Sequence, residues 1–286
     1  MPDGTGLAAF AKKYHKRFFD VGIAEQHAVT MAAGMACDGI HPYVAIYSTF
    51  LQRSYDQVLH DVCMQNLHVV FCLDRAGLVG DDGYTHHGVF DYSYLSMMPN
   101  MTIMSPKDEN ELRHMLFTST TIGGPVAIRY PRGSGLGVTC ADALHALPIG
   151  KAETLREGND VSIWAIGSMV KTACQVAELL AVDGIHANVV NARFVKPLDG
   201  ELLAAMAEKT GFIATIEENI LAGGFGSAVL QHLNKLNMLA ATKIINFAIP
   251  DSFVPQGARN LLLQDLHLDS ASIALAIKEK IKSKVK

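Results

Sequence analysis

Glu25 is the residue whose position most suggests chemistry, because it places a carboxylate at an otherwise apolar junction within residues 20–29 (DVGIAEQHAV). We expect a strand over residues 18–21 and a helix over residues 25–36, which puts Glu25 in the first helical turn at the carboxyl edge of a sheet. A carboxylate sequestered there is suited to holding a proton against a bound ring. The ordinary alternative is a glutamate that only complements the helix dipole.

A second group of polar residues follows the strand expected at residues 69–73. Residues 74–88 (DRAGLVGDDGYTHHG) combine glycines, which allow an irregular backbone, with a cation, carboxylates and two imidazoles. His86 and His87 could suggest a transition metal, but adjacent histidines point in different directions and no third ligand has a standard spacing. We therefore expect no metal site, and a structural hydrogen bond is the simpler role for His87.

Four runs together resemble the 1-deoxy-D-xylulose-5-phosphate synthase family, and the resemblance extends from the first residue to about Leu268. Transketolases and the beta subunits of pyruvate dehydrogenase share the glutamate but not the full set. The resemblance implies an enzyme that uses thiamine diphosphate to condense pyruvate with D-glyceraldehyde 3-phosphate, releasing CO₂ and forming a precursor of isoprenoids, thiamine and pyridoxal. The runs are residues 20–29, 47–57 (YSTFLQRSYDQ), 74–77 (DRAG) and 81–88 (DDGYTHHG).

The same resemblance assigns catalytic and cofactor-binding roles. Glu25 would activate the cofactor through its aminopyrimidine ring, and Phe50 would stack on that ring. His86 would lie beside the reacting carbon, where an imidazole can exchange protons near neutral pH. Asp82 would contact the hydroxyls of the acceptor sugar. Tyr84 departs from the family, which usually has a smaller residue there, so the shape of the loop is open.

Phosphate recognition falls to arginines near strand ends, since a guanidinium offers a fork of donors that matches phosphate oxygens. Arg75 and Arg132 match family residues that hold the sugar phosphate, and Tyr47 matches a tyrosine with the same task. Arg53, one turn inside the next helix, matches a further arginine of the active site. The alternative for each arginine is a surface ion pair of little energetic value.

The Mg²⁺ ligands of this family are not found in the sequence. The family holds the cofactor's diphosphate and Mg²⁺ with a Gly-Asp-Gly segment and an asparagine on a separate amino-terminal domain, and residues 80–83 (GDDG) do not match it. We therefore interpret the chain as the carboxyl-terminal portion of such an enzyme, without the first strand of its pyrimidine-binding domain. This predicts an exposed sheet edge beside the site and no turnover by the chain alone.

Short apolar runs alternate with amphipathic stretches, which predicts two three-layer α/β domains with mostly parallel sheets. We expect a pyrimidine-binding domain over residues 1–135, a linker over 136–158, and a transketolase C-terminal-like domain over 159–286. The expected strands are 18–21, 43–47, 69–73, 102–104, 126–129, 161–166, 187–191, 212–217 and 243–247. The expected helices are 25–36, 50–64, 108–121, 170–182, 200–209, 226–236 and those after Arg259.

Composition narrows the class of partner. The chain has 286 residues, 49% hydrophobic and 18% charged, with a net charge of −4. A slightly negative net charge of this kind predicts that neither nucleic acid nor a membrane is a partner, and it favours small-molecule substrates. No apolar run reaches membrane-spanning length, so we expect a cytoplasmic protein. The family resemblance also implies that the enzyme is a homodimer.

Two other functions stay open. The chain could be the carboxyl-terminal subunit of a split transketolase or 2-oxoacid dehydrogenase, with a separate partner that carries the metal motif. It could also be a non-catalytic fragment that keeps the shape of the site but binds no cofactor. Consumption of a ketose donor, or titration of thiamine diphosphate with and without an amino-terminal partner, distinguishes them.

Overall fold

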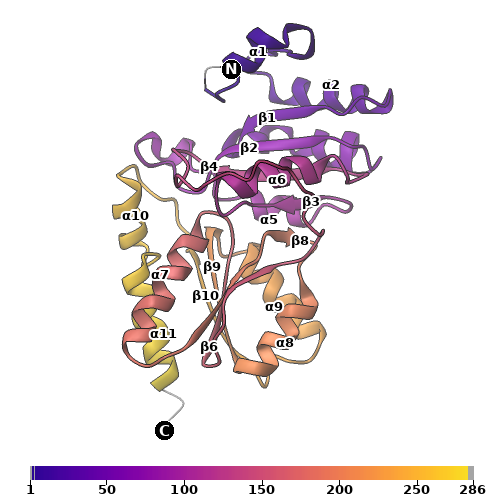
Figure 1. Ribbon diagram of the computed structural model, residues 1–286. Helices are drawn as coiled ribbons and strands as arrows, with labels where there is room; N and C mark the ends of the chain where they lie inside the picture. Colours follow the sequence, from indigo (N-terminus) through magenta and orange to yellow (C-terminus); the bar gives the residue numbers. More distant parts are fainter. Residues whose placement is uncertain (1, 3, 283–286) are drawn as a thin grey trace.

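Two α/β units, each built on a five-stranded sheet, make up the protein (Figure 1). The structure, a computed structural model, describes residues 2 and 4–282, so positions 283–286 of the expected second domain lie outside it. The first sheet and its helices occupy one half of the molecule, and the second sheet stands below it with α11 (Ser270–Lys282) along one side. The predicted α/β class is confirmed.

The first sheet has the order β1-β2-β4-β3-β8, parallel except for β8, which runs antiparallel to β3. Among the described strands β1 forms one edge of this sheet. At the other edge β8 comes from far later in the chain than the other four. The bounds are β1 (Tyr43–Tyr47), β2 (Val70–Ala76), β3 (Thr102–Met104), β4 (Val126–Pro131) and β8 (Phe194–Lys196).

Helices cover both faces of this sheet. Successive residues of a strand point to opposite faces, so neighbouring residues of β2 pack against different helices. Phe71 of β2 packs in a cluster with α2, whereas its neighbour Val70 packs with Met115 of α6. The side chain of Asp108 accepts the N–H of Glu111 and so caps the start of α6. The helices are α1 (Ala8–Lys13), α2 (Glu25–Cys37), α3 (Ser48–Leu51), α4 (Tyr55–Gln57), α5 (Asp91–Ser96) and α6 (Glu109–Ser119).

Two predictions for this unit are wrong. The segment 18–21 is not a strand, because none of the described strands pairs with it, and Phe19 keeps 60% of its surface exposed. The helix expected over 50–64 is broken into α3, a 3₁₀ turn (Gln52–Ser54), α4 and a π-helical turn (Val58–Cys63). The break lies at Ser54, whose φ of −111° and ψ of 21° leave the helical region.

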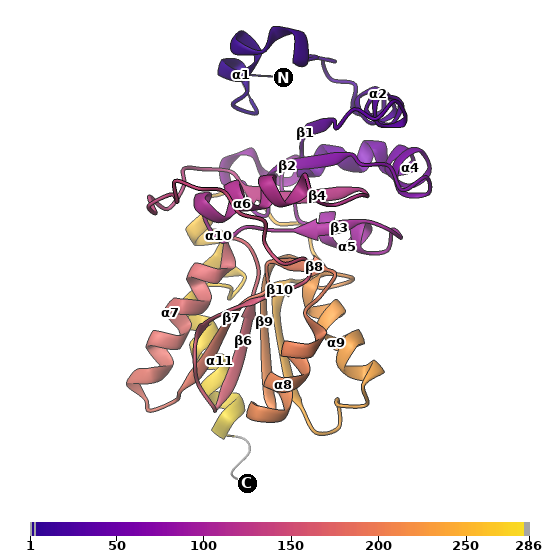
Figure 2. The ribbon, with the colours of Figure 1, turned by 45° about the vertical axis from the view of Figure 1, so that its right-hand side comes forward.

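The second sheet has the order β10-β9-β6-β7-β5, with β5 antiparallel to β7. Helices α7 and α11 pack on one face, and α8 and α9 lie on the other (Figures 1 and 2). Strand β5 falls inside the segment 136–158, and the predicted domain boundaries stay a prediction. The elements are β5 (Glu153–Arg156), β6 (Val161–Ala165), α7 (Met169–Val182), β7 (Ala187–Asn191), α8 (Gly200–Thr210), β9 (Phe212–Ile220), α9 (Phe225–Lys235), β10 (Lys243–Ile249) and α10 (Arg259–Asp265).

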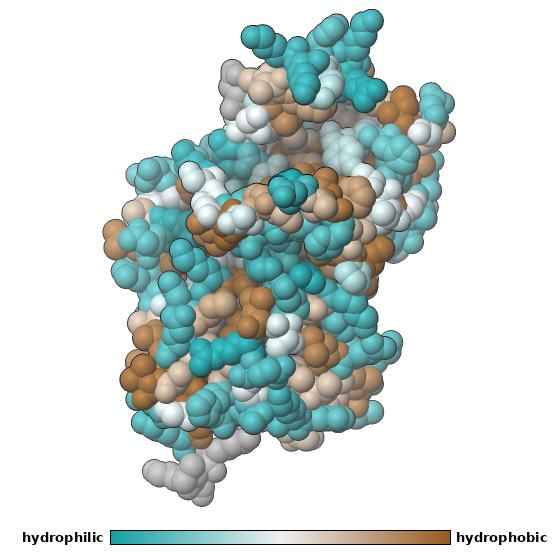
Figure 3. Space-filling model, viewed as in Figure 1, coloured by the Kyte–Doolittle hydropathy of each residue, from teal (hydrophilic) through white to brown (hydrophobic). Residues whose placement is uncertain are grey.

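One buried apolar cluster joins the two units. It runs from Phe71 and Tyr92 of the first unit to Trp164 and Phe225 of the second. On the outside, polar side chains alternate with small apolar patches over the face in Figure 3. None of the helices in the described part of the chain is long and apolar enough to cross a bilayer.

Candidate active site

Glu25 is the first residue of α2 and is only 9% exposed. Its Oε2 lies 3.3 Å from Nε of Arg53, close enough for an ion pair. The same oxygen is buried and accepts no hydrogen bond, since the contact with Arg53 does not have the geometry of one. A buried acceptor without a donor is costly unless a bound group supplies one. The observation fits a cofactor ring that presents a protonated nitrogen to Glu25.

An aromatic cluster follows the carboxyl end of β1. Tyr47 and Phe50 stack with ring centroids 5.7 Å apart, and His86 meets Phe50 edge-on at 5.3 Å. The guanidinium of Arg75 lies over the Tyr47 ring at 3.8 Å from its centroid. Arg53 lies one 3₁₀ turn beyond Phe50 and forms the ion pair with Glu25. The aromatic cluster and Glu25 are therefore neighbours. The structure thus gathers six predicted site residues at one sheet edge.

Arg75, the second-last residue of β2, has a left-handed backbone conformation with φ of 57°. Such a conformation is strained for a residue with a side chain, and strain of this kind clusters at functional sites. Nη1 donates to Asp74 at 2.7 Å and to the carbonyl of Gly4 at 2.8 Å. Burial raises the pKa of Asp74, although Arg75 opposes that shift. Among the described residues Nε and Nη2 of Arg75 have no acceptor, so they can bind an anion.

The substrate loop, which we define as residues 77–88, brings Asp82 to Arg132. Nη1 of Arg132 donates to Asp82 at 2.9 Å and to the carbonyl of Val79 at 3.1 Å. Both side chains remain partly exposed, at 43% for Arg132 and 36% for Asp82. A phosphate could therefore reach Arg132 from solvent while the arginine stays fixed to the loop.

His87 supports the loop from inside. It is 3% exposed, accepts the N–H of Val79 on Nδ1 at 3.1 Å, and donates from Nε2 to the carbonyl of Pro255 at 3.1 Å. The structural hydrogen bonds expected for His87 are thus present. Tyr84 is 60% exposed, so its ring does not pack into the loop.

Sequence reasoning missed a buried ion pair beneath the site. Nε of Arg129 lies 2.9 Å from both carboxylate oxygens of Asp91, and Nη2 donates to the carbonyls of Gly88 and Glu218. Burial lowers the pKa of Arg129 and Asp91 raises it, with a net upward shift. Ser48 also donates to Asp91 at 2.9 Å. The only signal was Arg129 itself, three residues before Arg132; nothing in the spacing pointed to Asp91.

The glycine-rich turn 223–226 is occupied by a side chain of the protein itself. The carboxylate of Glu217 accepts the N–H groups of Phe225 and Gly226, both at 2.7 Å, at the start of α9. Burial raises the pKa of Glu217 to about 8, against these hydrogen bonds. An internal carboxylate therefore fills the position at which a phosphate would bind a helix N-terminus.

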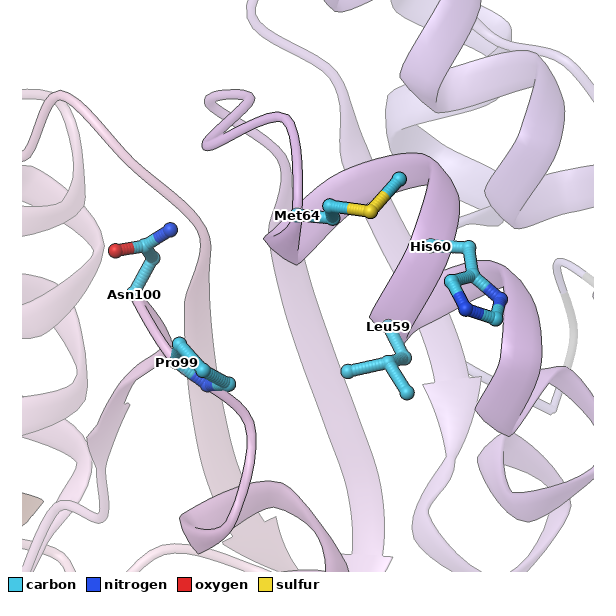
Figure 4. A pocket seen from close by; sticks show the side chains of 5 residues that line it. All are labelled: Leu59, His60, Met64, Pro99 and Asn100. Atoms are coloured by element: carbon cyan, nitrogen blue, oxygen red, sulfur yellow. The ribbon is translucent and has the colours of Figure 1, made fainter.

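A separate apolar pocket of about 380 Å³ lies away from this chemistry (Figure 4). Its residues lie in the π-helical turn, directly after it, or before β3, at the amino edge of the first sheet, whereas the predicted site residues lie at the carboxyl edge. Within residues 2 and 4–282, no cluster of three or more His, Cys, Asp or Glu residues could hold a metal ion. The pocket is lined by Leu59, His60, Met64, Pro99 and Asn100.

Comparison with known proteins defines the class first. The transketolase pyrimidine-binding domain matches residues 1–136, and the transketolase C-terminal domain matches residues 150–273. A solved structure described as a split-gene transketolase, an inactive beta4 tetramer, is 30% identical with a TM-score of 0.88, covering 97% of this chain and 89% of that one. The fold and both domains are those of the transketolase class.

Proteins with similar sequences identify the family within this class. The 1-deoxy-D-xylulose-5-phosphate synthase 1 of Geobacter sulfurreducens is 60% identical over 96% of this chain. The 1-deoxy-D-xylulose-5-phosphate synthase of Pelotomaculum thermopropionicum is 56% identical over 98% of it. The chain belongs to the 1-deoxy-D-xylulose-5-phosphate synthase family, which confirms the resemblance. It spans 43% and 44% of the length of these two relatives.

Proposed function

We propose that the chain is the carboxyl-terminal portion of an enzyme that condenses pyruvate with D-glyceraldehyde 3-phosphate, giving 1-deoxy-D-xylulose 5-phosphate and CO₂. The names of the similar proteins support the reaction, and their greater length supports a portion rather than the whole. The single observation that carries the proposal is the buried Oε2 of Glu25, which lacks a hydrogen-bond donor.

Glu25 and Phe50 would hold the cofactor's pyrimidine ring, Glu25 through a hydrogen bond to its nitrogen and Phe50 through its face. Bound thiamine diphosphate would supply a carbon nucleophile for the substrate's carbonyl group. Glu25 is suited to accept this hydrogen bond because α2 fixes its position and its buried Oε2 has no other donor. Arg53 would balance the charge of Glu25 from its position 3.3 Å away.

The substrate side of the site would divide its tasks between two groups. Arg75, Arg132 and Tyr47 would bind the phosphate, since Arg75 already lies over Tyr47 and keeps free donors. His86 and Asp82 would move protons and bind hydroxyls of the acceptor. Fixing both ends of a substrate in this way lowers the barrier by removing orientational freedom.

The remaining expectations belong to the same proposal. Mg²⁺ would be bound outside this chain, on an amino-terminal diphosphate-binding domain, and the assembled enzyme would be a cytoplasmic homodimer. The chain alone is expected to release no CO₂ from pyruvate in the presence of D-glyceraldehyde 3-phosphate, thiamine diphosphate and Mg²⁺. Robust CO₂ release by the purified chain would refute the requirement for another domain.

Calorimetric titration tests the role of Glu25. Thiamine diphosphate with Mg²⁺ is added to the chain mixed with the amino-terminal segment of the Geobacter sulfurreducens relative. Glu25→Gln should weaken binding by about tenfold, because the acceptor loses its charge and a hydrogen bond to a neutral amide oxygen is weaker than one to a carboxylate. Glu201→Gln is the matched control, since Glu201 also lies in a first helical turn but is solvent-exposed. Equal affinities for the Glu25→Gln variant and the unaltered chain would refute the assignment.

A second candidate is the carboxyl-terminal subunit of a split transketolase. The specific support is the split-gene transketolase structure, of which this chain covers 89% at 30% identity. The two candidates differ in donor substrate. With the amino-terminal segment supplied, consumption of a ketose phosphate would favour the transketolase, and consumption of pyruvate the synthase.

A further inference from the structure

Two neighbouring glutamates at the end of β9 serve opposite faces of the second sheet. Glu217 turns toward α9, where it accepts the N–H groups described above. Glu218, the next residue, points to the other face because side chains alternate along a strand. There its carboxylate accepts the backbone N–H of Leu78 at 2.7 Å, so a residue of the second unit holds the substrate loop.

The carboxylate of Glu218 is itself held tightly. The side chain is 1% exposed, and Arg259 of α10 donates to Oε1 at 3.1 Å and to Oε2 at 2.5 Å. Ser168 donates to Oε2 at 2.9 Å. A buried carboxylate with a guanidinium and a hydroxyl as partners has little freedom to move. The position of the Leu78 N–H is therefore fixed by groups outside the first unit.

The start of the loop leaves no space for another arrangement. A Cβ at Gly77 would lie 2.6 Å from Cδ of Glu218, and the φ of Gly77 is +78°. Further contacts join the same two units: Gly257 donates to the carbonyl of Gly80 at 3.3 Å, and His87 donates to Pro255 as described. The loop is thus held from the second unit at its beginning, middle and end.

We propose that Glu218, fixed by Arg259, is a positioning residue that sets the substrate loop and, through it, the Asp82 and Arg132 pair. Arg132 donates to the carbonyl of Val79, the residue next to Leu78. A shift of the loop start would move Val79 and so the guanidinium proposed to bind phosphate. The functional half of this inference rests on the proposed function, whereas the holding of the loop does not.

Hydrogen exchange measured by mass spectrometry on the chain without ligand tests the holding of the loop. Glu218→Ala should raise exchange in a peptide covering 77–88 by at least about tenfold, since Leu78 loses a charged acceptor. Glu218→Gln keeps an acceptor oxygen and should stay within about threefold of the unaltered chain. Glu217→Ala is the matched control, expected to raise exchange at 225–226 and leave 77–88 unchanged.

Two results would overturn the inference. One is unchanged exchange of 77–88 in Glu218→Ala. The other is an equal rise in the peptide 126–131 of β4, which would mean general loosening. Titration with inorganic phosphate is a second measurement: Glu218→Ala should weaken binding at least about fivefold, with rescue by Glu218→Gln. If the unaltered chain binds no phosphate, the proposed phosphate site fails, and the exchange data still decide whether Glu218 holds the loop.

Discussion

Removing the charge of Asp91 is expected to destabilise the protein far more than any surface substitution. Arg129 is 4% exposed and Asp91 1% exposed, so neither charge can be hydrated once its partner is lost. Breaking a buried pair by changing one member costs about 3 to 5 kcal/mol. Asp91→Asn leaves the two carbonyl acceptors of Arg129 in place, at Gly88 and Glu218, but no anion. We therefore expect a loss of about 3 kcal/mol, the lower end of that range.

Urea unfolding measures this loss, because Trp164 is the one tryptophan of the chain and is fully buried in the cluster that joins the units. Fluorescence and circular dichroism must give the same transition before a free energy is assigned. The control is Asp56→Asn, which removes the exposed partner of His60 and should cost about 0.5 kcal/mol or less. A loss below about 1 kcal/mol for Asp91→Asn would show that the pair is hydrated and refute the reasoning.

Two further outcomes follow from individual residues. Burial raises the pKa of Glu217 from 4.5 to about 8, so the folded state binds more protons than the unfolded state between these values, and the unfolding free energy should fall as pH rises through that window. Glu217→Gln should remove most of this decline in urea unfolding at pH 5 and pH 8; an unchanged slope would contradict the assignment. Gly88→Ala should cost about 1 to 3 kcal/mol or more, because the new Cβ would lie 2.6 Å from the carbonyl oxygen of Arg75. Gly123→Ala, with open space around the new Cβ, is its control in the same urea unfolding assay, and equal stabilities would argue against the crowding.

The gathering of the site residues could be predicted from sequence because it follows from topology. β1 and β2 are parallel neighbours, so Tyr47 at the end of one and Arg75 at the end of the other must meet at the same edge. Because Tyr47 and Arg75 lie within a residue or two of the ends of their strands, few other positions were open to them. Their roles stay predictions, since geometry alone shows proximity and not chemistry.

The errors on strands and the missed ion pair share one physical cause, which is dependence on partners remote in sequence. Residues 18–21 are apolar enough for a strand, but a strand exists only with a neighbour to pair with. The three residues of β8 are too few to show a period, and their partner β3 lies some ninety positions earlier. Asp91 and Arg129 are 38 residues apart, and their contact depends on how α5 packs.

The return of β8 to the first sheet has a consequence for engineering. Cutting the chain between the halves would remove the strand that covers β3 and expose a new row of backbone N–H and C=O groups, a template for aggregation. The halves are therefore expected to resist separate expression or exchange with those of a distant relative. A functional chimera would need its crossover placed after Lys196, so that the borrowed module keeps its own closing strand.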